Sequence, residues 1–121
     1  MVKEYFGASH VPLSPAVRAG DFVFVSGQVP VGEDKKIVEG GVAAETRQVL
    51  ENVRKCLQMA GCDLGDVVKT TVWLRDREDF GAFNEAYAEF FAENPPARST
   101  AESRLMIDIA VEIEAVAYKP V

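Results

Sequence analysis

A change in the spacing of apolar residues partway along the chain constrains its fold more than any other feature. Between residues 42 and 60, apolar side chains recur every three or four positions, which predicts an amphipathic helix, and Gly61 is a natural stop for it. Between residues 67 and 74 the period falls to two, which predicts a strand. The helical stripe comprises Val49, Leu50, Val53, Cys56, Leu57 and Ala60. The strand is expected to turn Val68, Thr70, Val72 and Leu74 to one face.

Further strands and a second helix are expected around these two segments. Strands are predicted at residues 2–6, 21–26, 97–105 and 109–118. Asp76 fits the N-cap of the second helix, which ends at Asn94-Pro95-Pro96 because a residue before proline disfavours helical backbone. Its stripe of Phe80, Phe83, Tyr87, Phe90 and Phe91 is predicted to be core. The order β-β-α-β-α-β-β predicts an α+β fold in one domain, residues 1–121, with a mixed sheet and both helices on one face.

The sheet face away from the helices would carry aromatic side chains. By alternation it receives several of Phe22, Phe24, Trp73 and Tyr118. An extended apolar surface on a soluble protein usually marks an interface, and a chain of this size gains from association because a small domain buries a limited share of its surface. We therefore expect this face to pack against neighbouring subunits.

Charge and composition narrow the possible partners. The chain has 13 Lys and Arg against 19 Asp and Glu, a formal net charge of -6, and its basic residues are scattered. Nucleic-acid binding needs a basic footprint, so no nucleic-acid partner is expected. One histidine, His10, and two cysteines without a CxxC pattern argue against a zinc site. No apolar segment approaches the roughly 20 residues of a membrane span, and the N-terminal residues lack a signal-peptide pattern, so we expect a cytoplasmic protein with no membrane partner.

The candidate binding residue is Arg98, which follows the rigid Pro95-Pro96 pair. A guanidinium is a planar, permanently charged fork that suits two-point capture of a carboxylate, although an arginine can also form an ordinary surface ion pair. Farther along, Glu112 and Glu114 alternate with apolar residues and therefore share one face of a strand. Either carboxylate can position a water molecule or belong to a solvated face. Ser26-Gly27 reads as a strand end where backbone approaches closely, or as a binding element.

Five segments, taken in order, resemble the RidA/YjgF family of reactive-imine deaminases. They are Phe24-Val25-Ser26-Gly27-Gln28-Val29-Pro30, Val68-Lys69-Thr70-Thr71-Val72, Asp79-Phe80 with Asn84-Glu85-Ala86-Tyr87, Pro96-Ala97-Arg98-Ser99, and Val111-Glu112-Ile113-Glu114-Ala115. The similarity runs from about Pro15 to Tyr118. It implies a chorismate-mutase-like subunit whose sheet forms a barrel in a homotrimer, with small-molecule sites between subunits. It also implies hydrolysis of 2-iminobutanoate or 2-iminopropanoate, released by pyridoxal-phosphate enzymes, to a 2-keto acid and ammonia without a cofactor or metal.

The resemblance also assigns roles to particular positions. Arg98 matches the arginine that grips the substrate carboxylate, and Glu112 matches the acidic residue that orients the attacking water. The expected substrate-binding residues are Ser26, Gly27, Asn84 and Thr100. The amide of Gly27 is a donor in this scheme, and Thr100, which stands where many members have cysteine, contributes through its backbone.

The chain departs from the family pattern at several positions, and three other functions remain open. Ala16 follows Pro15 where many members have tyrosine, and the segment from Arg98 to Glu112 is one residue shorter than expected. Arg104-Leu105-Met106 replaces the more typical Arg-Leu-Pro. The alternatives are a non-catalytic module that binds small carboxylates, a ribonuclease, and a related deaminase of a larger amino acid admitted by a pocket that Ala16 widens.

Overall fold

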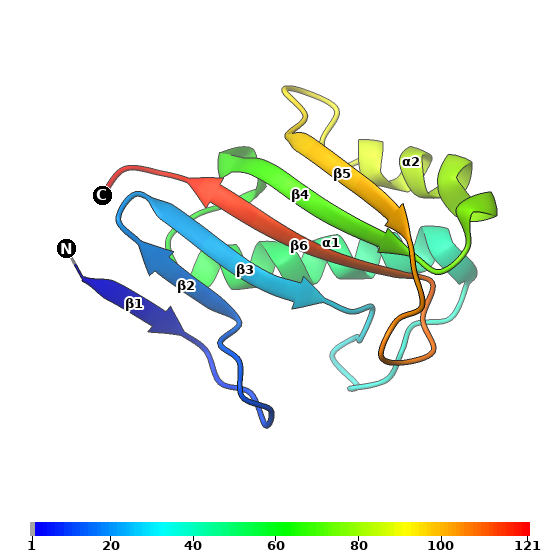
Figure 1. Cartoon of the computed structure of the whole chain (residues 1–121), viewed down its shortest axis with the longest axis horizontal. Helices are drawn as coiled ribbons and strands as arrows, with labels where there is room; N and C mark the ends of the chain where they lie inside the picture. The colour runs from blue at the N-terminus through cyan, green and yellow to red at the C-terminus, as the bar shows by residue number, and fades with distance from the viewer. Residues whose placement is uncertain (1) are drawn as a thin grey trace.

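The computed structural model describes residues 2–121, which form one mixed sheet covered on one side by helices (Figure 1). The strands are β1 (Lys3–Phe6), β2 (Ala16–Ala19), β3 (Phe22–Gln28), β4 (Val67–Leu74), β5 (Ala97–Glu102) and β6 (Val111–Tyr118). The helices are α1 (Gly41–Met59) and α2 (Phe80–Ala88), with 3₁₀ turns at Leu64–Asp66 and Arg77–Asp79. The sheet order is β1-β2-β3-β6-β4-β5, so β1 and β5 are the edges.

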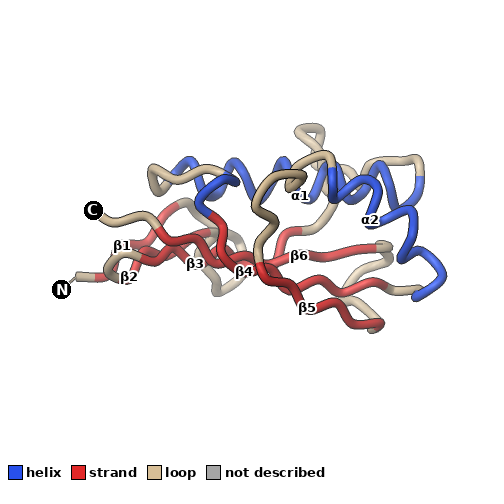
Figure 2. Tube along the Cα trace, turned by 90° about the horizontal axis from the view of Figure 1, so that it is seen from above, coloured by secondary structure: helices blue, strands red, loops and turns tan. Residues whose placement is uncertain are grey.

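The predicted α+β architecture is confirmed. Strands β4 and β5 run parallel and the other neighbours run antiparallel, which makes the sheet mixed. Figure 2 shows both helices on the same side of the sheet. The apolar stripe of α1 faces the sheet, and the core between the layers includes Leu50, Leu57, Phe83 and Ile113, all fully buried. Within residues 2–121, no helix is long and apolar enough to cross a membrane.

Helix α1 ends where the sequence predicted. Gly61 adopts a left-handed conformation at φ 80°, which a residue with a side chain rarely does. Its amide donates to the carbonyl of Gln58, and the amide of Cys62 donates to the carbonyl of Leu57. These two bonds close the last turn as a Schellman motif, so the helix stops and the chain turns back toward β4.

The structure adds one strand and moves several boundaries. Strand β2 was not predicted because it is only four residues long and carries Arg18, a residue that is rarely buried. Strand β5 ends at Glu102, before the predicted end at residue 105, and β6 begins at Val111 rather than at residue 109. The face assignment at the start of β4 was wrong: the register shifts between Val67 and Lys69, so Val67 is buried and Val68 is 45% exposed.

Arg18 is buried because backbone carbonyls satisfy its guanidinium. Its Nη1 donates to the carbonyls of Gly20 and Lys119, at 3.2 and 3.0 Å, and its Nη2 donates to the carbonyl of Ala60, at 3.2 Å. Ala60 is the C-cap of α1, where unpaired carbonyls and the helix dipole both favour a cation. One side chain thereby joins β2, the end of α1 and the chain after β6.

The sheet face opposite the helices exposes aromatic side chains, as predicted. Phe22, Phe24 and Tyr118 are each more than two-fifths exposed, while Trp73 is partly buried. The rings of Phe22 and Tyr118 lie 5.1 Å apart on the neighbouring strands β3 and β6. We call this aromatic surface the open face. The subunit interface expected there stays a prediction.

Candidate active site

Arg98 lies on the edge strand β5 with its side chain on the helix-covered face of the sheet. In the parallel register of β4 and β5 it pairs with Thr70, which is buried. Its guanidinium carbon lies 4.9 Å from the ring centre of Tyr87, 5.2 Å from that of Phe83 and 5.7 Å from that of Phe80. None of the ion pairs formed within residues 2–121 involves Arg98. The charged fork is therefore supported by aromatic rings and not neutralised by a carboxylate of the described chain.

The chain just before β5 brings Arg98 to this position. Asn94 has a left-handed backbone at φ 49°, which asparagine tolerates better than most residues and which helps to turn the chain away from α2. Pro95 and Pro96 then fix the backbone as it enters the strand. Arg98 is consequently placed by an ordered edge strand and a stiff approach rather than by a flexible loop.

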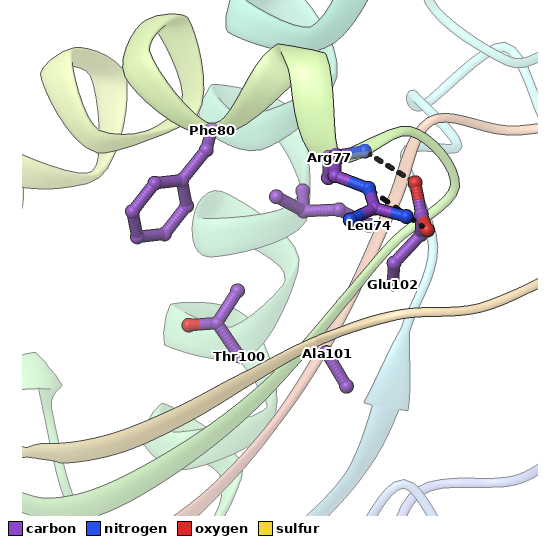
Figure 3. Close-up of a pocket in the computed structure, with 6 residues that line it drawn as sticks. All are labelled: Leu74, Arg77, Phe80, Thr100, Ala101 and Glu102. Carbon is purple, nitrogen blue, oxygen red and sulfur yellow. Dashed lines mark hydrogen bonds and ion pairs between the residues drawn. The ribbon is translucent and has the colours of Figure 1, made fainter.

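A cavity of about 330 Å³ opens on the same face (Figure 3). It is lined by Leu74, Arg77, Phe80, Thr100, Ala101 and Glu102. Phe80 belongs both to this lining and to the rings around Arg98. Thr100 follows Arg98 by two residues on β5, so it shares that face of the sheet. At the opposite wall, the backbone amide of Arg77 donates to Glu102 at 2.8 Å, and the two side chains form an ion pair.

Phe80 and Asn84 belong to the Arg98 side of the sheet. The prediction that Phe80 is a core residue was wrong, because its ring is 45% exposed and borders the cavity. Asn84 follows Phe80 by one helical turn on α2 and is half-buried. Sequence reasoning placed the aromatic stripe in the core and missed its contact with Arg98. The spacing of the aromatic residues predicts that α2 is amphipathic. It does not show that Arg98 of β5 lies over the aromatic rings of this helix.

Glu112 lies on β6 with its side chain on the open face, opposite to Arg98. It pairs with Trp73 of β4, whereas the helix-facing residue Val72 pairs with Ile113. The Glu112 carboxylate rests against the backbone of Gly27: a Cβ atom on Gly27 would overlap Oε2 of Glu112 and lie 3.2 Å from its Cδ. Burial raises the pKa of Glu112 above its ordinary value, and the nearby charge of Glu114 raises it further.

A smaller cavity of about 180 Å³ adjoins Glu112. It is lined by Trp73, Ser103, Arg104, Leu105, Met106 and Glu112. The connection between β5 and β6 thus supplies most of the wall, and Met106 at its tip is almost fully exposed. This loop contains the Arg-Leu-Met departure from the family pattern, so the departure falls beside the predicted water-positioning residue.

Ser26 uses its hydroxyl to hold the loop before β2. Its Oγ donates to the carbonyl of Ser14 at 2.6 Å, and its amide donates to the carbonyl of Pro15 at 3.0 Å. The hydroxyl proton is therefore committed to backbone, which leaves the Ser26 oxygen as an acceptor. Ala16 is fully buried in the core and lines neither the cavity bordered by Phe80 nor the one beside Glu112. The expectation that Ala16 widens the pocket is therefore not supported within one subunit.

The predicted site residues form two groups on opposite faces of the sheet. Arg98, Thr100 and Asn84 lie toward the helices. Glu112 faces the other way and contacts Gly27, which follows Ser26. Gly27 also borders a third cavity, of about 360 Å³, between the N-terminal loop and α1. Among residues 2–121 there is no cluster of three or more His, Cys, Asp or Glu side chains able to hold a metal ion.

The fold and this divided set of residues define a small α+β subunit with a mixed six-stranded sheet. Within residues 2–121 its Arg98 forms no ion pair, and the acidic residue Glu112 lies on the other face of the sheet. The model of the family described as Endoribonuclease L-PSP matches residues 7–119. The chain belongs to this family, the RidA/YjgF family indicated by the sequence motifs.

Two relatives and one solved structure illustrate the similarity. A RutC family protein of Pyrococcus horikoshii is 50% identical over 110 residues, which cover 89% of this chain and 87% of the relative. The 2-iminobutanoate/2-iminopropanoate deaminase of Escherichia coli K12 is 42% identical over 112 residues, covering 89% and 88%. The crystal structure of Escherichia coli TdcF with bound serine is 34% identical, with a TM-score of 0.89 over 96% of this chain and 98% of that one.

Proposed function

We propose that the protein is an imine deaminase that hydrolyses 2-iminobutanoate and 2-iminopropanoate to 2-keto acids and ammonia. The observation that carries the proposal is the state of Arg98, a guanidinium over three aromatic rings with no carboxylate paired to it in the described chain. One of these rings, that of Phe80, also lines the cavity. The geometry of such a fork matches two-point binding of a carboxylate or a phosphate, and the substrates proposed here carry a carboxylate. The 42% identical deaminase and the serine-bound relative support the same substrate chemistry.

The proposed site is shared between subunits of a homotrimer. Arg98 and Glu112 point to opposite faces of one sheet, so a site that uses both takes Arg98 from one subunit and Glu112 from a neighbour. The aromatic open face supplies the apolar surface that such an assembly needs. In this scheme the open faces form the inner barrel of the trimer, and each of its three clefts contains one complete set of residues.

The reaction follows from these placements. Arg98 binds the substrate carboxylate at two points and thereby fixes the adjacent imine carbon. Glu112 accepts a proton from a water molecule as the water oxygen bonds to that carbon, and the carbon–nitrogen double bond becomes a single bond. Glu112 returns this proton to the nitrogen, which gives a carbinolamine. Glu112 then accepts the carbinolamine hydroxyl proton and passes it to the nitrogen as the carbon–nitrogen bond breaks, so the oxygen forms the keto group and ammonia leaves. The raised pKa of Glu112 suits this exchange, because a base is most effective when its pKa lies near the working pH.

The proposed reaction requires few catalytic groups. Water is added and ammonia leaves, with no change of oxidation state, so the reaction needs no electron carrier. Imines already hydrolyse in water, and orientation plus charge placement supply the acceleration. We accordingly propose that residues 1–121 act as a single domain without a cofactor, a metal ion, a nucleic-acid partner or a membrane partner, in the cytoplasm.

The direct test generates 2-aminoacrylate with a pyridoxal-phosphate dehydratase and follows keto-acid formation. The protein should accelerate the spontaneous reaction, and Arg98→Ala should abolish the acceleration. Arg54→Ala is the matched control, because Arg54 also stacks on a ring, that of Phe90, but is paired with Glu51. No acceleration by the wild-type protein at any concentration would remove the deaminase function and leave a carboxylate-binding module.

Mixed assemblies test the shared site. Arg98→Ala and Glu112→Gln proteins should each retain only a small residual activity alone but reach about one quarter of wild-type activity when their subunits are scrambled in equal amounts. Half of the subunits then supply Arg98 and, independently, half of the neighbours supply Glu112. A site built within one subunit would give no recovery, because every subunit carries one of the two lesions.

A deaminase of a larger imino acid is the second candidate. The cavity beside Arg98 measures about 330 Å³ and has Leu74 and Phe80 in its lining, which leaves room for an apolar side chain longer than a methyl or ethyl group. The ratio of kcat/KM for isobutyl-bearing and methyl-bearing imines separates the candidates, and a ratio above one favours the larger substrate. Cleavage of RNA that persists through repeated purification would instead support the ribonuclease alternative.

A further inference from the structure

Tyr87 makes the shortest of the three ring contacts with Arg98. The guanidinium carbon lies 4.9 Å from its ring centre, and the ring is almost fully buried on α2. An arginine above an aromatic face is attracted by the negative charge of the π-system, more strongly when both groups are partly desolvated.

The hydroxyl of Tyr87 ties this ring to the sheet. It lies 2.8 Å from Oγ1 of Thr70, in a hydrogen bond that is buried. Thr70 is the residue of β4 that pairs with Arg98 of β5. The three residues therefore form a closed triangle: Thr70 and Arg98 are joined through the strand register, Thr70 and Tyr87 through the hydroxyl bond, and Tyr87 and Arg98 through the ring face.

We infer that Tyr87, fixed by its hydroxyl bond to Thr70, is the positioning residue that holds the Arg98 guanidinium in place as the carboxylate fork. The inference rests on the proposed function, because it assigns to Arg98 the capture of the substrate carboxylate. A long arginine side chain without a carboxylate partner samples many rotamers, and binding would then have to restrict them. The ring restricts the side chain before substrate arrives, so the fork is already oriented.

The protonation state of Tyr87 keeps the triangle intact. Burial raises the pKa of its phenol, while the Thr70 hydrogen bond and the charge of Arg98 act in the opposite direction. The net direction is upward, so the phenol stays neutral at physiological pH. A neutral hydroxyl donates to or accepts from Thr70, and the ring supports the guanidinium without forming an ion pair that would compete with the substrate.

The test compares variants that keep or remove the ring. Tyr87→Leu removes the π-face, Tyr87→Phe keeps it and loses the hydroxyl bond, and Thr70→Val loses the same bond from the other side. Phe91→Leu is the matched control: Phe91 is equally buried and packs against Tyr87 with the ring centres 4.8 Å apart, but its ring is not among those in contact with Arg98. Thermal unfolding of each variant reports the loss of packing separately from the loss of function.

Tyr87→Leu should raise KM for the imine about tenfold, and Kd for the product 2-oxobutanoate by the same factor, with a smaller change in kcat. Tyr87→Phe keeps the ring and should raise KM and Kd by a smaller factor, about threefold, and Thr70→Val should do the same; combining the two should add no further loss, because both remove one bond. Phe91→Leu should lower Tm as much as Tyr87→Leu does and leave KM within about twofold.

Equal KM and Kd in Tyr87→Leu and Phe91→Leu would overturn the inference while leaving the deaminase function in place. If Tyr87→Leu does not fold, Tyr87→Phe and Thr70→Val decide: unchanged KM and Kd in both would overturn the role given to the hydroxyl bond. Failure of the proposed function is visible separately, as a wild-type protein that neither accelerates imine hydrolysis nor binds 2-oxobutanoate, and that result would overturn the inference too.

Discussion

Gly27→Ala tests whether Glu112 is the water-positioning group. The new Cβ atom would overlap Oε2 of Glu112 and would lie 3.2 Å from its Cδ and 3.4 Å from its Cγ. The Gly27 backbone is outside the left-handed region, so alanine adds no backbone strain there. The substitution also keeps the Gly27 amide, which the resemblance assigns as a donor. Its effect should therefore fall on one carboxylate.

The expected effect on catalysis is large and the effect on stability is small. The atom in the way is the end of a flexible side chain, so the carboxylate swings aside at a cost of about 1 kcal/mol in rotamer strain. Displacing a catalytic group by about 1 Å costs on the order of 100-fold in rate. We therefore expect kcat for 2-iminopropanoate hydrolysis to fall about 100-fold while Tm changes by only a few degrees. Coupled keto-acid detection and thermal unfolding measure the two quantities.

Two comparisons make the Gly27→Ala result decisive. Gly65→Ala is the control, because a Cβ at Gly65 meets no atom within 4 Å, and it should leave kcat unchanged. In Glu112→Gln, adding Gly27→Ala should lower kcat little further, since both changes disable the same carboxylate. A Gly27→Ala enzyme with kcat within threefold of wild type would refute the reasoning, and so would full additivity of the two losses.

Three other predictions follow from the described contacts. Glu114→Gln should move the acid-side limb of the pH–kcat profile to lower pH, because removing a neighbouring negative charge lowers the raised pKa of Glu112; an unmoved limb would assign the limb to another group. Arg18→Met should lower the free energy of unfolding by about 3 kcal/mol in urea titrations, since it leaves buried carbonyls without a charged donor, and a loss below about 1 kcal/mol would contradict that role. Phe24→Asp should shift light-scattering mass toward the monomer and remove activity together, whereas an active monomer would contradict the shared site.

The layers of this fold were predictable because strong apolar periods mark them. The stripe of α1, its stop at Gly61 and the alternation in β6 each agree with local propensity, so the sequence alone indicated two helices on one face of a mixed sheet. The exposed aromatic side chains of the open face followed from the same alternation. Periodicity was sufficient wherever an element was long and one of its faces was buried.

The predictions from the sequence were wrong where tertiary contacts override the local pattern. Strand β2 is short, and its buried Arg18 is accommodated by carbonyls that come from α1 and the C-terminal residues, which no local window contains. The irregularity between Val67 and Lys69 reverses the faces of the first residues of β4 through pairing with β6. Phe80 fits a helical stripe, yet it lies at the start of α2, where the cavity beside β5 exposes it.

The sequence identified the candidate site residues, but it did not show how these residues are arranged in space. A rigid approach to Arg98 and an acidic residue on a strand were visible in the sequence, whereas the faces they occupy depend on strand register. Register is fixed by which strands pair, and the pairing of β4 with both β5 and β6 brings together segments far apart in the chain. The contact between Gly27 and Glu112 was missed for the same reason. The two residues lie 85 positions apart, and nothing in the sequence indicates that they touch.

The register explains why this subunit needs a neighbour for the proposed chemistry. Strand β4 separates β5 from β6, and along it the residues that face the helices alternate with those on the open face. Arg98 pairs with the helix-facing Thr70, and Glu112 pairs with Trp73 on the other side. A shift of one residue in the pairing of β6 would place both charged groups on one face, but it would also turn the buried residues Val111, Ile113, Ala115 and Ala117 of that strand out of the core. The packing that stabilises the sheet therefore keeps the two groups apart, and only a second sheet edge or face brought alongside can reunite them.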